Sequence, residues 1–330
     1  MEENKKIKSQ IDKEAAKNYY YPFKLEAFKK VYKKDDTTLK KFSKPLHSFI
    51  NGLDYDYLKT TRYVSLNYKA SKEELFTEVT RFILSLDDKD IINAYASFFA
   101  NDLDIIEFTD IQNGYYGGSS YETDNNTRLS IIRGNNMDDF SKLAHEFGHY
   151  IQNRLFRSNL NKFVKYSLIE ISSYYFELLM MHSLDKNSRY VIPEGLLINN
   201  KLQYFSRLIW DLQLGKFIAS LEEYDSSLIN GFSIENLKAF YDEETLSRLR
   251  IHDLVTSTNY LTSFMIASKL YVDTINDQEE GLKEYKDLMT SSKDNLEDFL
   301  KSGNVNFLED NSSYELLKLQ SQIAYKRLVK

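Results

Sequence analysis

The sequence predicts a mainly α-helical fold that contains a small β element. Only 3 prolines and 11 glycines occur among 330 residues, and no proline follows Pro193, so few residues break helices in the second half. Hydrophobic residues make up 42% of the chain, enough for a substantial core. Apolar residues recur at helical spacing in residues 71–86, 138–156, 168–184, 202–221, 260–275 and 314–328.

Two short stretches have the composition of strands. They are residues 105–108 and residues 128–132, and the second directly precedes the helix predicted at 138–156. Between them, residues 113–120 read Asn-Gly-Tyr-Tyr-Gly-Gly-Ser-Ser, without the Lys-Ser/Thr ending of a phosphate-binding loop. This segment is a hairpin-like connection or a loop that faces a substrate, and both interpretations stay open.

Composition excludes several classes of function. The chain has 43 basic and 49 acidic residues, a formal charge of −6, which argues against nucleic acid as a partner. No apolar span is long enough to cross a membrane, and residues 1–17 lack the apolar core of a signal peptide. We therefore expect a cytoplasmic protein. There are no cysteines, so any metal must be held by histidines and carboxylates.

Residues 145–149 read His-Glu-Phe-Gly-His, the densest chemical signal in the chain. On a helix, His145 and His149 lie one turn apart and can present two imidazole nitrogens to one metal ion. Glu146 lies beside that face, where its carboxylate could accept a proton from a metal-bound water. The alternative is a surface helix that carries these residues by chance. A metzincin site is excluded, because Gln152 and Leu155 replace the required glycine and histidine.

A third metal ligand must then come from elsewhere in the chain. Glu170, Ser173 and Glu177 fall on one face of the helix predicted at 168–184. Buried carboxylates in an apolar helix are costly unless they are paired or bind metal. We favour Glu170 as the ligand and Glu177 as the acceptor that orients a ligand histidine. A pair of salt bridges between helices is the alternative.

One further histidine has a suggestive position. His252 lies in the run Arg248-Leu-Arg-Ile-His252-Asp, eight residues before Tyr260. A histidine and a tyrosine placed there could donate hydrogen bonds to the oxyanion of a tetrahedral intermediate. The alternative for His252 is a structural histidine at the edge of the core.

The order of these motifs resembles the oligoendopeptidase F / thimet oligopeptidase family of zinc peptidases. The resemblance is carried by the glycine-rich segment 113–120, then Arg128-Leu-Ser-Ile-Ile, then Asp138-Asp-Phe-Ser-Lys-Leu-Ala-His-Glu-Phe-Gly-His149. The Glu170-x-x-Ser173-x-x-x-Glu177 run is similar to the family's third-ligand helix. Residues 285–292 and 299–305 resemble the end of the catalytic domain of oligoendopeptidase F.

The resemblance implies a zincin-like catalytic domain with a deep cleft and a small β-sheet beside the active-site helix. It implies that His145, His149 and Glu170 bind Zn²⁺ and that Glu146 activates a zinc-bound water. By the same resemblance, His252 and Tyr260 stabilise the transition state, although the family's several tyrosines after the histidine are thinned here. It also implies that the strand at 128–132 lies along the cleft, where it could pair with the substrate backbone.

Members of the family are much longer than this chain. We expect residues 1–60 to form a short N-terminal helical segment and residues 61–330 to form the catalytic domain. The family's larger N-terminal helical region would be mostly missing, so the cleft would be more open, or closed by a partner or by a second copy in a homo-oligomer.

The sequence thus predicts a zinc-dependent endopeptidase that hydrolyses short unstructured peptides. One alternative is a non-catalytic peptide-binding or scaffold protein that retains a peptidase fold. Another is a protease dedicated to one leader or signal peptide.

Overall fold

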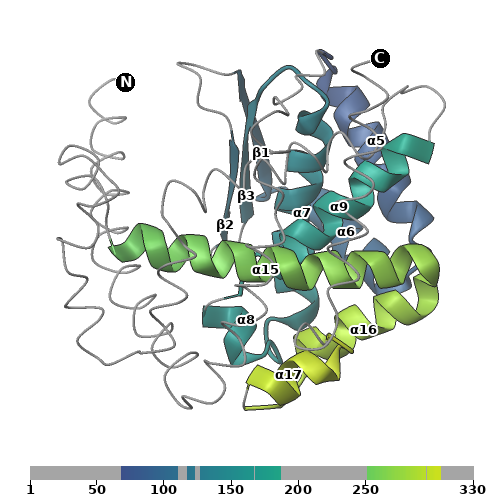
Figure 1. The fold of residues 1–330 in the computed structure, drawn as a ribbon. Coiled ribbons are helices and arrows are strands. Elements are labelled where there is room, and N and C mark those ends of the chain that lie inside the picture. Colours follow the sequence, from purple (N-terminus) through teal and green to yellow (C-terminus); the bar gives the residue numbers. More distant parts are fainter. Residues whose placement is uncertain are drawn as a thin grey trace, which may run out of the picture.

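The computed structural model describes residues 68–110, 117–122, 127–166, 168–186, 251–294 and 296–305. These ranges contain helices and one small sheet (Figure 1). In chain order the elements are α5 (Lys72–Ser85), α6 (Lys89–Ala100), β1 (Ile105–Asp110), β2 (Gly117–Glu122), β3 (Thr127–Arg133), α7 (Asp138–Phe156), α8 (Lys162–Tyr166), α9 (Ile171–Lys186), α15 (Ile251–Asn276), α16 (Gln278–Thr290) and α17 (Leu296–Ser302).

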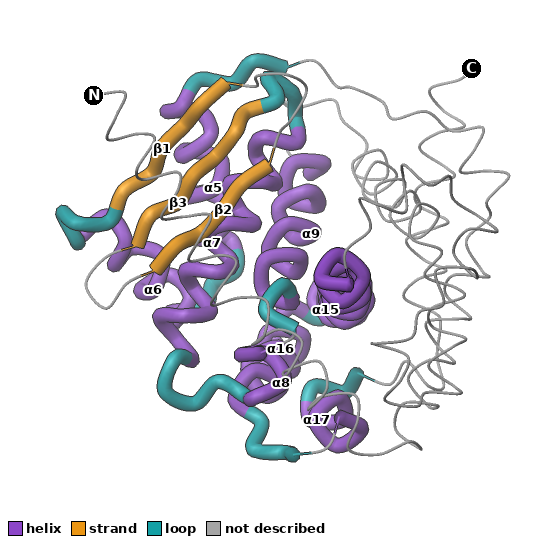
Figure 2. The backbone as a smooth tube through the Cα atoms, turned by 90° about the vertical axis from the view of Figure 1, so that its left-hand side faces the viewer, coloured by secondary structure: helices purple, strands orange, loops and turns teal. Residues whose placement is uncertain are grey.

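The sheet lies on one side of the helices. Figure 2 shows the strands over α5, α6 and α7, with α9 beyond α7 and α15 farther from the sheet. Helix α7 packs against β2 and β3 on one side and most extensively against α9 on the other, and α9 in turn packs against α15. This arrangement confirms the predicted mainly α-helical class with a small sheet beside the helix of the His-Glu-Phe-Gly-His motif.

The strand order is β1-β3-β2, with β1 parallel and β2 antiparallel to β3. Strand β3 is paired with β1 over residues 128–133 and with β2 over residues 127–132, so both of its edges are occupied at residues 128–132. The prediction that residues 128–132 pair with a substrate backbone is therefore wrong, because no edge of this strand is free. The glycine-rich segment is also corrected in part: residues 117–120 belong to strand β2 and not to a loop, while residues 113–116 lie outside the described residues.

Helix starts follow the local chemistry of the sequence. Ser71 accepts a hydrogen bond from the backbone N–H of Glu74 at 3.1 Å, as expected of an N-cap. Helix α6 was not predicted, although Ile91, Tyr95 and Phe98 form its buried face at helical spacing. Its cap is Asp88, which accepts from two backbone N–H groups of the first turn.

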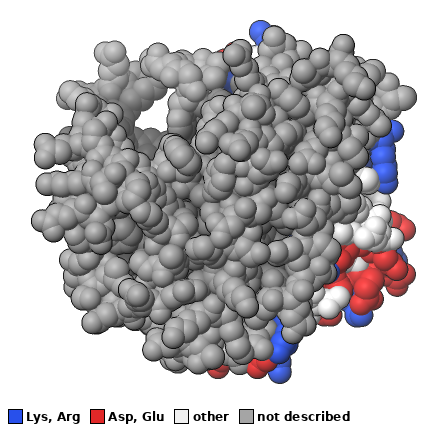
Figure 3. Space-filling model, in the orientation of Figure 1, with Lys and Arg blue, Asp and Glu red and all other residues white. Residues whose placement is uncertain are grey.

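The start of α16 gathers acidic side chains, visible at the right of Figure 3. Asp277 caps the helix by accepting from the backbone N–H of Glu280 at 3.2 Å, and Glu279 and Glu280 occupy the first turn. Negative charge at a helix N-terminus is favourable, because the macrodipole is positive there. These exposed acids therefore stabilise the start of α16.

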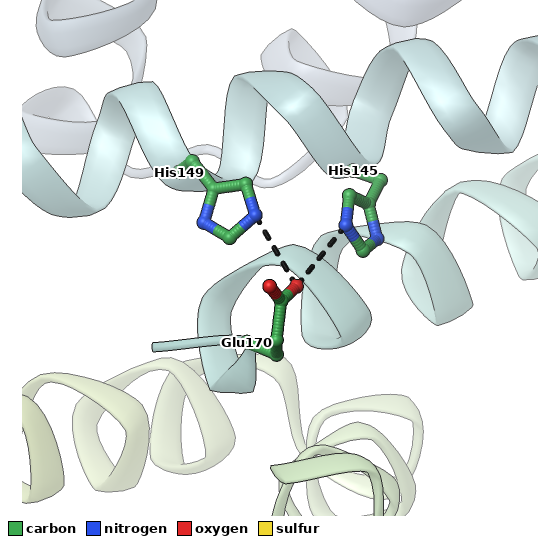
Figure 4. A group of neighbouring side chains, drawn as sticks. All are labelled: His145, His149 and Glu170. Carbon is green, nitrogen blue, oxygen red and sulfur yellow. Dashed lines mark ion pairs between the residues drawn. The ribbon is translucent and has the colours of Figure 1, made fainter. Parts of the chain in front are cut away.

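Helix α7 spans the residues predicted for it, Asp138–Phe156. One face carries Phe147, which is fully buried with its ring 4.8 Å from Tyr95 and 5.3 Å from Phe98 between centroids. These edge contacts hold α7 against α6. The opposite face, with His145 and His149, is turned toward α9 (Figure 4).

Helix α9 is the most enclosed element of the described fold. Every residue from 171 to 181 is buried. The Tyr175 hydroxyl lies 2.7 Å from Thr274 Oγ1 of α15, and the Ser172 hydroxyl lies 2.8 Å from the Tyr285 hydroxyl of α16. Burial raises the pKa of Tyr175 and of Tyr285 above the usual range, so both phenols stay protonated and keep these contacts. The helix is thereby held from two sides.

Several predictions fall beyond the described residues. The predicted helices at 202–221 and 314–328 and the N-terminal segment 1–60 lie outside them, so the domain boundary at residue 60 stays a prediction. The helix predicted at 260–275 lies within α15, which begins earlier, at Ile251. Among the described helices, none combines the length and apolarity that crossing a membrane requires.

Replacing Phe147 by alanine should lower the free energy of unfolding by about 3–5 kcal/mol, because a fully buried ring leaves a cavity between α6 and α7. Urea unfolding followed by circular dichroism measures the change. Phe99→Ala is the control, since Phe99 belongs to the same ring cluster but is 53% exposed and should cost much less. Equal losses from the two substitutions would contradict this account of the core.

Candidate metal centre

Two imidazole rings from consecutive turns of α7 point the same way (Figure 4). His145 and His149 have ring centroids 5.2 Å apart and planes at 82° to each other. Their side chains are 18% and 16% exposed, so both rings are mostly enclosed but remain partly accessible to solvent. This is the arrangement that the four-residue spacing predicts on a helix.

Glu170, immediately before α9, meets both rings. Its Oε2 atom lies 3.2 Å from Nε2 of His145 and 3.2 Å from Nε2 of His149 (Figure 4). Ligand atoms at corners of a tetrahedron around Zn²⁺ are about 3.4 Å apart, so these separations fit a shared ion. All three candidate ligand atoms lie within 4.8 Å of one another. The structure thus brings the three predicted ligands together.

Two more side chains of α9 orient this group. Glu177 Oε2 lies 3.0 Å from Nδ1 of His145, so that the ring can donate its Nδ1–H and direct Nε2 toward the centre. The Ser173 hydroxyl lies 2.8 Å from Oε2 of Glu170, to which it donates. Metal-binding residues in proteins are commonly held by such outer contacts, which fix the tautomer and direction of each ligand.

The electrostatics of the centre call for positive charge. Burial would lower the pKa of His145, but its hydrogen bonds to Glu170 and Glu177 outweigh burial and raise the pKa well above the usual range. For Glu170 the directions are reversed: burial would raise its pKa, but the nearby His149 and His145 hold that pKa well below its usual value. Without a cation, Glu170 and Glu177 favour the protonated form of the His145 imidazole, and a divalent ion would supply positive charge in its place.

Glu146 lies on the side of α7 that faces the sheet. The residue is 3% exposed, and its side chain lies against β2 at Gly118. Its Oε2 atom has no hydrogen-bond partner among the described residues. Burial raises the pKa of Glu146, an effect that the charges of His145 and His149 partly oppose. A carboxylate with raised proton affinity and a free oxygen is suited to accept a proton from a bound water.

Helices α7 and α9 touch backbone to backbone at Gly148. A Cβ atom at this residue would lie 2.8 Å from the carbonyl oxygen of Ser172 and 2.8 Å from the Cα atom of Ser173. Contacts this short force the backbones apart, so glycine is what allows the helices to meet here. Glu170 and Glu177 flank this contact along α9, and their reach to the histidines depends on it.

The two residues predicted to stabilise the transition state are both on α15. Tyr260 is half-buried, and its ring centroid lies 6.5 Å from that of Tyr174. Tyr174 in turn makes an edge contact with His145 at 5.3 Å. The ring of Tyr174 therefore contacts both Tyr260 and His145. His252 is the second residue of α15, and its side chain lies outside the described part of the structure.

Comparison with known proteins supports the fold. No protein-family model matches the sequence, and no curated protein sequence does. Solved structures do match. A Bacillus anthracis protein assigned as an oligoendopeptidase F has a TM-score of 0.54 at 13% identity over 94% of this chain. PZ peptidase A, solved with an inhibitor, has a TM-score of 0.55 at 11% identity over 94% of this chain. A Chlamydophila abortus protein assigned as a peptidase has a TM-score of 0.50 at 16% identity, again over 94%.

The chain has the fold of the oligoendopeptidase F structures. The resemblance inferred from the motifs is thus confirmed for the fold. The chain spans 57% of the Bacillus structure, 59% of PZ peptidase A and 56% of the Chlamydophila structure. Identities this low show the fold alone, and the activity has to be argued from the site.

Sequence reasoning missed three residues of this site. The roles of Gly118, Gly148 and Tyr174 depend on contacts between distant segments. For the glycines a local signal existed: glycine inside a helix or a strand is unfavourable by itself and often marks a close backbone approach. For Tyr174, one tyrosine among 25, no signal in the sequence set it apart.

Gly148→Ala should weaken the binding of added Zn²⁺ by about tenfold or more, because separating α7 from α9 moves Glu170 and Glu177 away from the histidines. Competition with a chromogenic chelator measures the affinity. Gly281→Ala is the matched control: a Cβ there would lie 2.5 Å from backbone atoms of Thr274, so it also separates two helices, α15 and α16, away from the site. It should lower stability and leave Zn²⁺ affinity unchanged. Wild-type affinity in Gly148→Ala would contradict the proposed geometry.

Proposed function

We propose that this protein is a zinc-dependent endopeptidase that hydrolyses short unstructured peptides. The observation that carries the proposal is the convergence of two Nε2 atoms of α7 and one carboxylate oxygen before α9, with each ring nitrogen 3.2 Å from that oxygen. A second carboxylate, Glu146, is buried beside this group. Three protein ligands with a neighbouring general base are the composition of catalytic zinc sites.

His145, His149 and Glu170 would hold the ion. Two imidazoles and one carboxylate form a set that Zn²⁺ accepts readily, and cysteine ligands are ruled out by the composition. When bound, zinc supplies a Lewis acid that lowers the pKa of water at its open coordination position and polarises a carbonyl. Glu177 and Ser173 keep His145 and Glu170 directed at the ion through their hydrogen bonds.

Glu146 would move the proton. Its carboxylate accepts a proton from the attacking water as the water oxygen forms a bond to the scissile carbonyl carbon. It then delivers that proton to the leaving amine as the C–N bond breaks. The Oε2 atom without a partner among the described residues and the pKa raised by burial both suit a group that accepts a proton and then releases it.

The outer edge of β2 would bind the substrate backbone. In the part of the chain that the structure describes, β2 pairs with β3 on one side only. Strand β2 therefore forms one edge of the sheet (Figure 2). An extended peptide can add to such an edge through main-chain hydrogen bonds. This binding mode needs an unfolded segment, which favours short unstructured peptides as substrates. It also moves the role assigned to residues 128–132 to the neighbouring strand.

Helix α15 would supply transition-state stabilisation. Tyr260 reaches the neighbourhood of His145 through Tyr174, and His252 lies two turns earlier on the same helix. Both side chains can donate to an oxyanion. A binding protein that only retained the fold would have no use for Glu146, because a buried carboxylate oxygen without a partner is costly.

Glu146→Gln should retain Zn²⁺ but lose peptide hydrolysis by about 10²- to 10⁴-fold, because the amide cannot accept the proton of water. Mass spectrometry of a mixed peptide library, incubated with and without chelator, measures the activity and the cleavage preference. His145→Ala is the companion variant and should release the metal, as elemental analysis would show. Full hydrolysis by Glu146→Gln would refute the mechanism, and a wild-type protein without chelator-sensitive cleavage would favour the binding-protein alternative.

Ser173→Ala should weaken Zn²⁺ binding by about tenfold, because Glu170 loses the hydroxyl that donates to its Oε2 atom. Ser172→Ala is the matched control on the adjacent residue. Its hydroxyl is equally buried but contacts Tyr285, so the substitution should cost about 1 kcal/mol of stability without changing Zn²⁺ affinity. Equal Zn²⁺ affinity in the two variants would show that Ser173 does not orient the ligand.

A further inference from the structure

Gly118 of β2 lies directly against the side chain of Glu146. It is paired with Ile131 of β3, whose side chain is fully buried on the helix side of the sheet. Residues directly opposite in a sheet point to the same face, so a side chain at residue 118 would point toward α7. A Cβ atom there would lie 2.9 Å from Cδ and 3.0 Å from Cγ of Glu146, and closer still to Oε1.

Contact with β2 restrains the Glu146 carboxylate on one side. Its Oε2 atom is buried and has no hydrogen-bond partner among the described residues. The side chain is flexible, and its position therefore depends on the surfaces that enclose it. One of these surfaces is the bare backbone of the strand at Gly118.

We propose that Gly118 is a positioning residue for Glu146: the missing side chain leaves the space in which the carboxylate lies beside the histidines. This inference rests on the proposed function, in which Glu146 transfers the proton. The three atoms nearest to a Cβ at residue 118 all belong to Glu146, so a side chain there would act through Glu146.

Alanine at residue 118 would be tolerated by the fold but not by the site. Gly118 does not have a positive φ, and alanine is more favourable than glycine inside a strand. The group that must move is the end of a flexible side chain, which can rotate without shifting the backbone. Proton transfer is more demanding, because displacing a catalytic group by about 1 Å can cost on the order of 10²-fold in rate.

A stability cycle tests the steric relation without any assay of activity. Gly118→Ala is made in the wild-type protein and in Glu146→Ala, and the Tm of each zinc-loaded variant is measured. In the Glu146→Ala background the added methyl group meets no carboxylate. The change in Tm caused by Gly118→Ala should therefore be about 2 °C more favourable in that background than in the wild type. Gly134→Ala is the matched control, because its Cβ would meet the side chain of Asn136 and should give the same change in both backgrounds.

The kinetic test separates positioning from a general structural effect. In Gly118→Ala, kcat should fall by about 10²-fold, while KM and Zn²⁺ affinity stay at wild-type values, since the strand backbone and the ligands remain in place. In Glu146→Gln, the further substitution Gly118→Ala should leave the residual rate unchanged, because the base is already lost.

The outcomes distinguish this inference from the proposed function. Identical Tm changes in the two backgrounds would overturn the inference even if the protein is an active peptidase, as would a loss of Zn²⁺ binding in Gly118→Ala. Coupling between residues 118 and 146 in a protein with no peptidase activity would overturn the proposed function alone and support the packing of Gly118 on Glu146.

Discussion

The close approach of α7 and α9 is the constraint on which the site depends. Helix α7 supplies two imidazoles, but Glu170 and Glu177 reach them only because the two helix backbones touch at Gly148. A typical helix pair is separated by 8–10 Å between axes, a distance set by the side chains at the contact. Glycine at the contact shortens this distance. The geometry of the centre is therefore a property of helix packing, and no local feature of either helix would produce it.

Charge explains why such a group persists inside an apolar core. Three carboxylates are buried around the two histidines: Glu146, Glu170 and Glu177. A group of ionised carboxylates in such an environment would be strongly unfavourable without compensating positive charge. Protonation of His145 compensates for part of this negative charge, as its raised pKa indicates. A divalent cation provides the same charge at the point where the three ligand atoms meet, and it leaves the rings neutral. The same buried carboxylates that would destabilise the core without a cation would then favour tight binding of the cation.

The sequence predicted those parts of the fold that depend on local pattern. The extent of α7 and the strand character of β1 and β3 follow from residue spacing and composition, and the placing of Glu170 beside the histidines follows from the cost of burying a carboxylate. The order of the strands in the sheet could not be predicted in this way. Nothing in residues 128–132 shows that β3 lies between two partners, because strand order depends on contacts between segments far apart in the chain. Residues 117–120 lie in a segment, 113–120, for which the sequence predicts a connection or a loop, since two glycines and two serines have low strand propensity.

That low propensity has a physical counterpart in the structure. A strand with glycine at residue 118 is weaker by itself than one with alanine or valine there, just as a helix with Gly148 is weaker than one with alanine, by about 0.5–1 kcal/mol in each case. Such costs are a noticeable fraction of the stability of a typical domain. Both glycines lie where a backbone must come close to a chemical group, β2 to the Glu146 carboxylate and α7 to the backbone of α9. At Gly118 and Gly148, alanine would favour the local strand or helix, whereas the geometry of the site requires glycine. At both positions the chain has glycine.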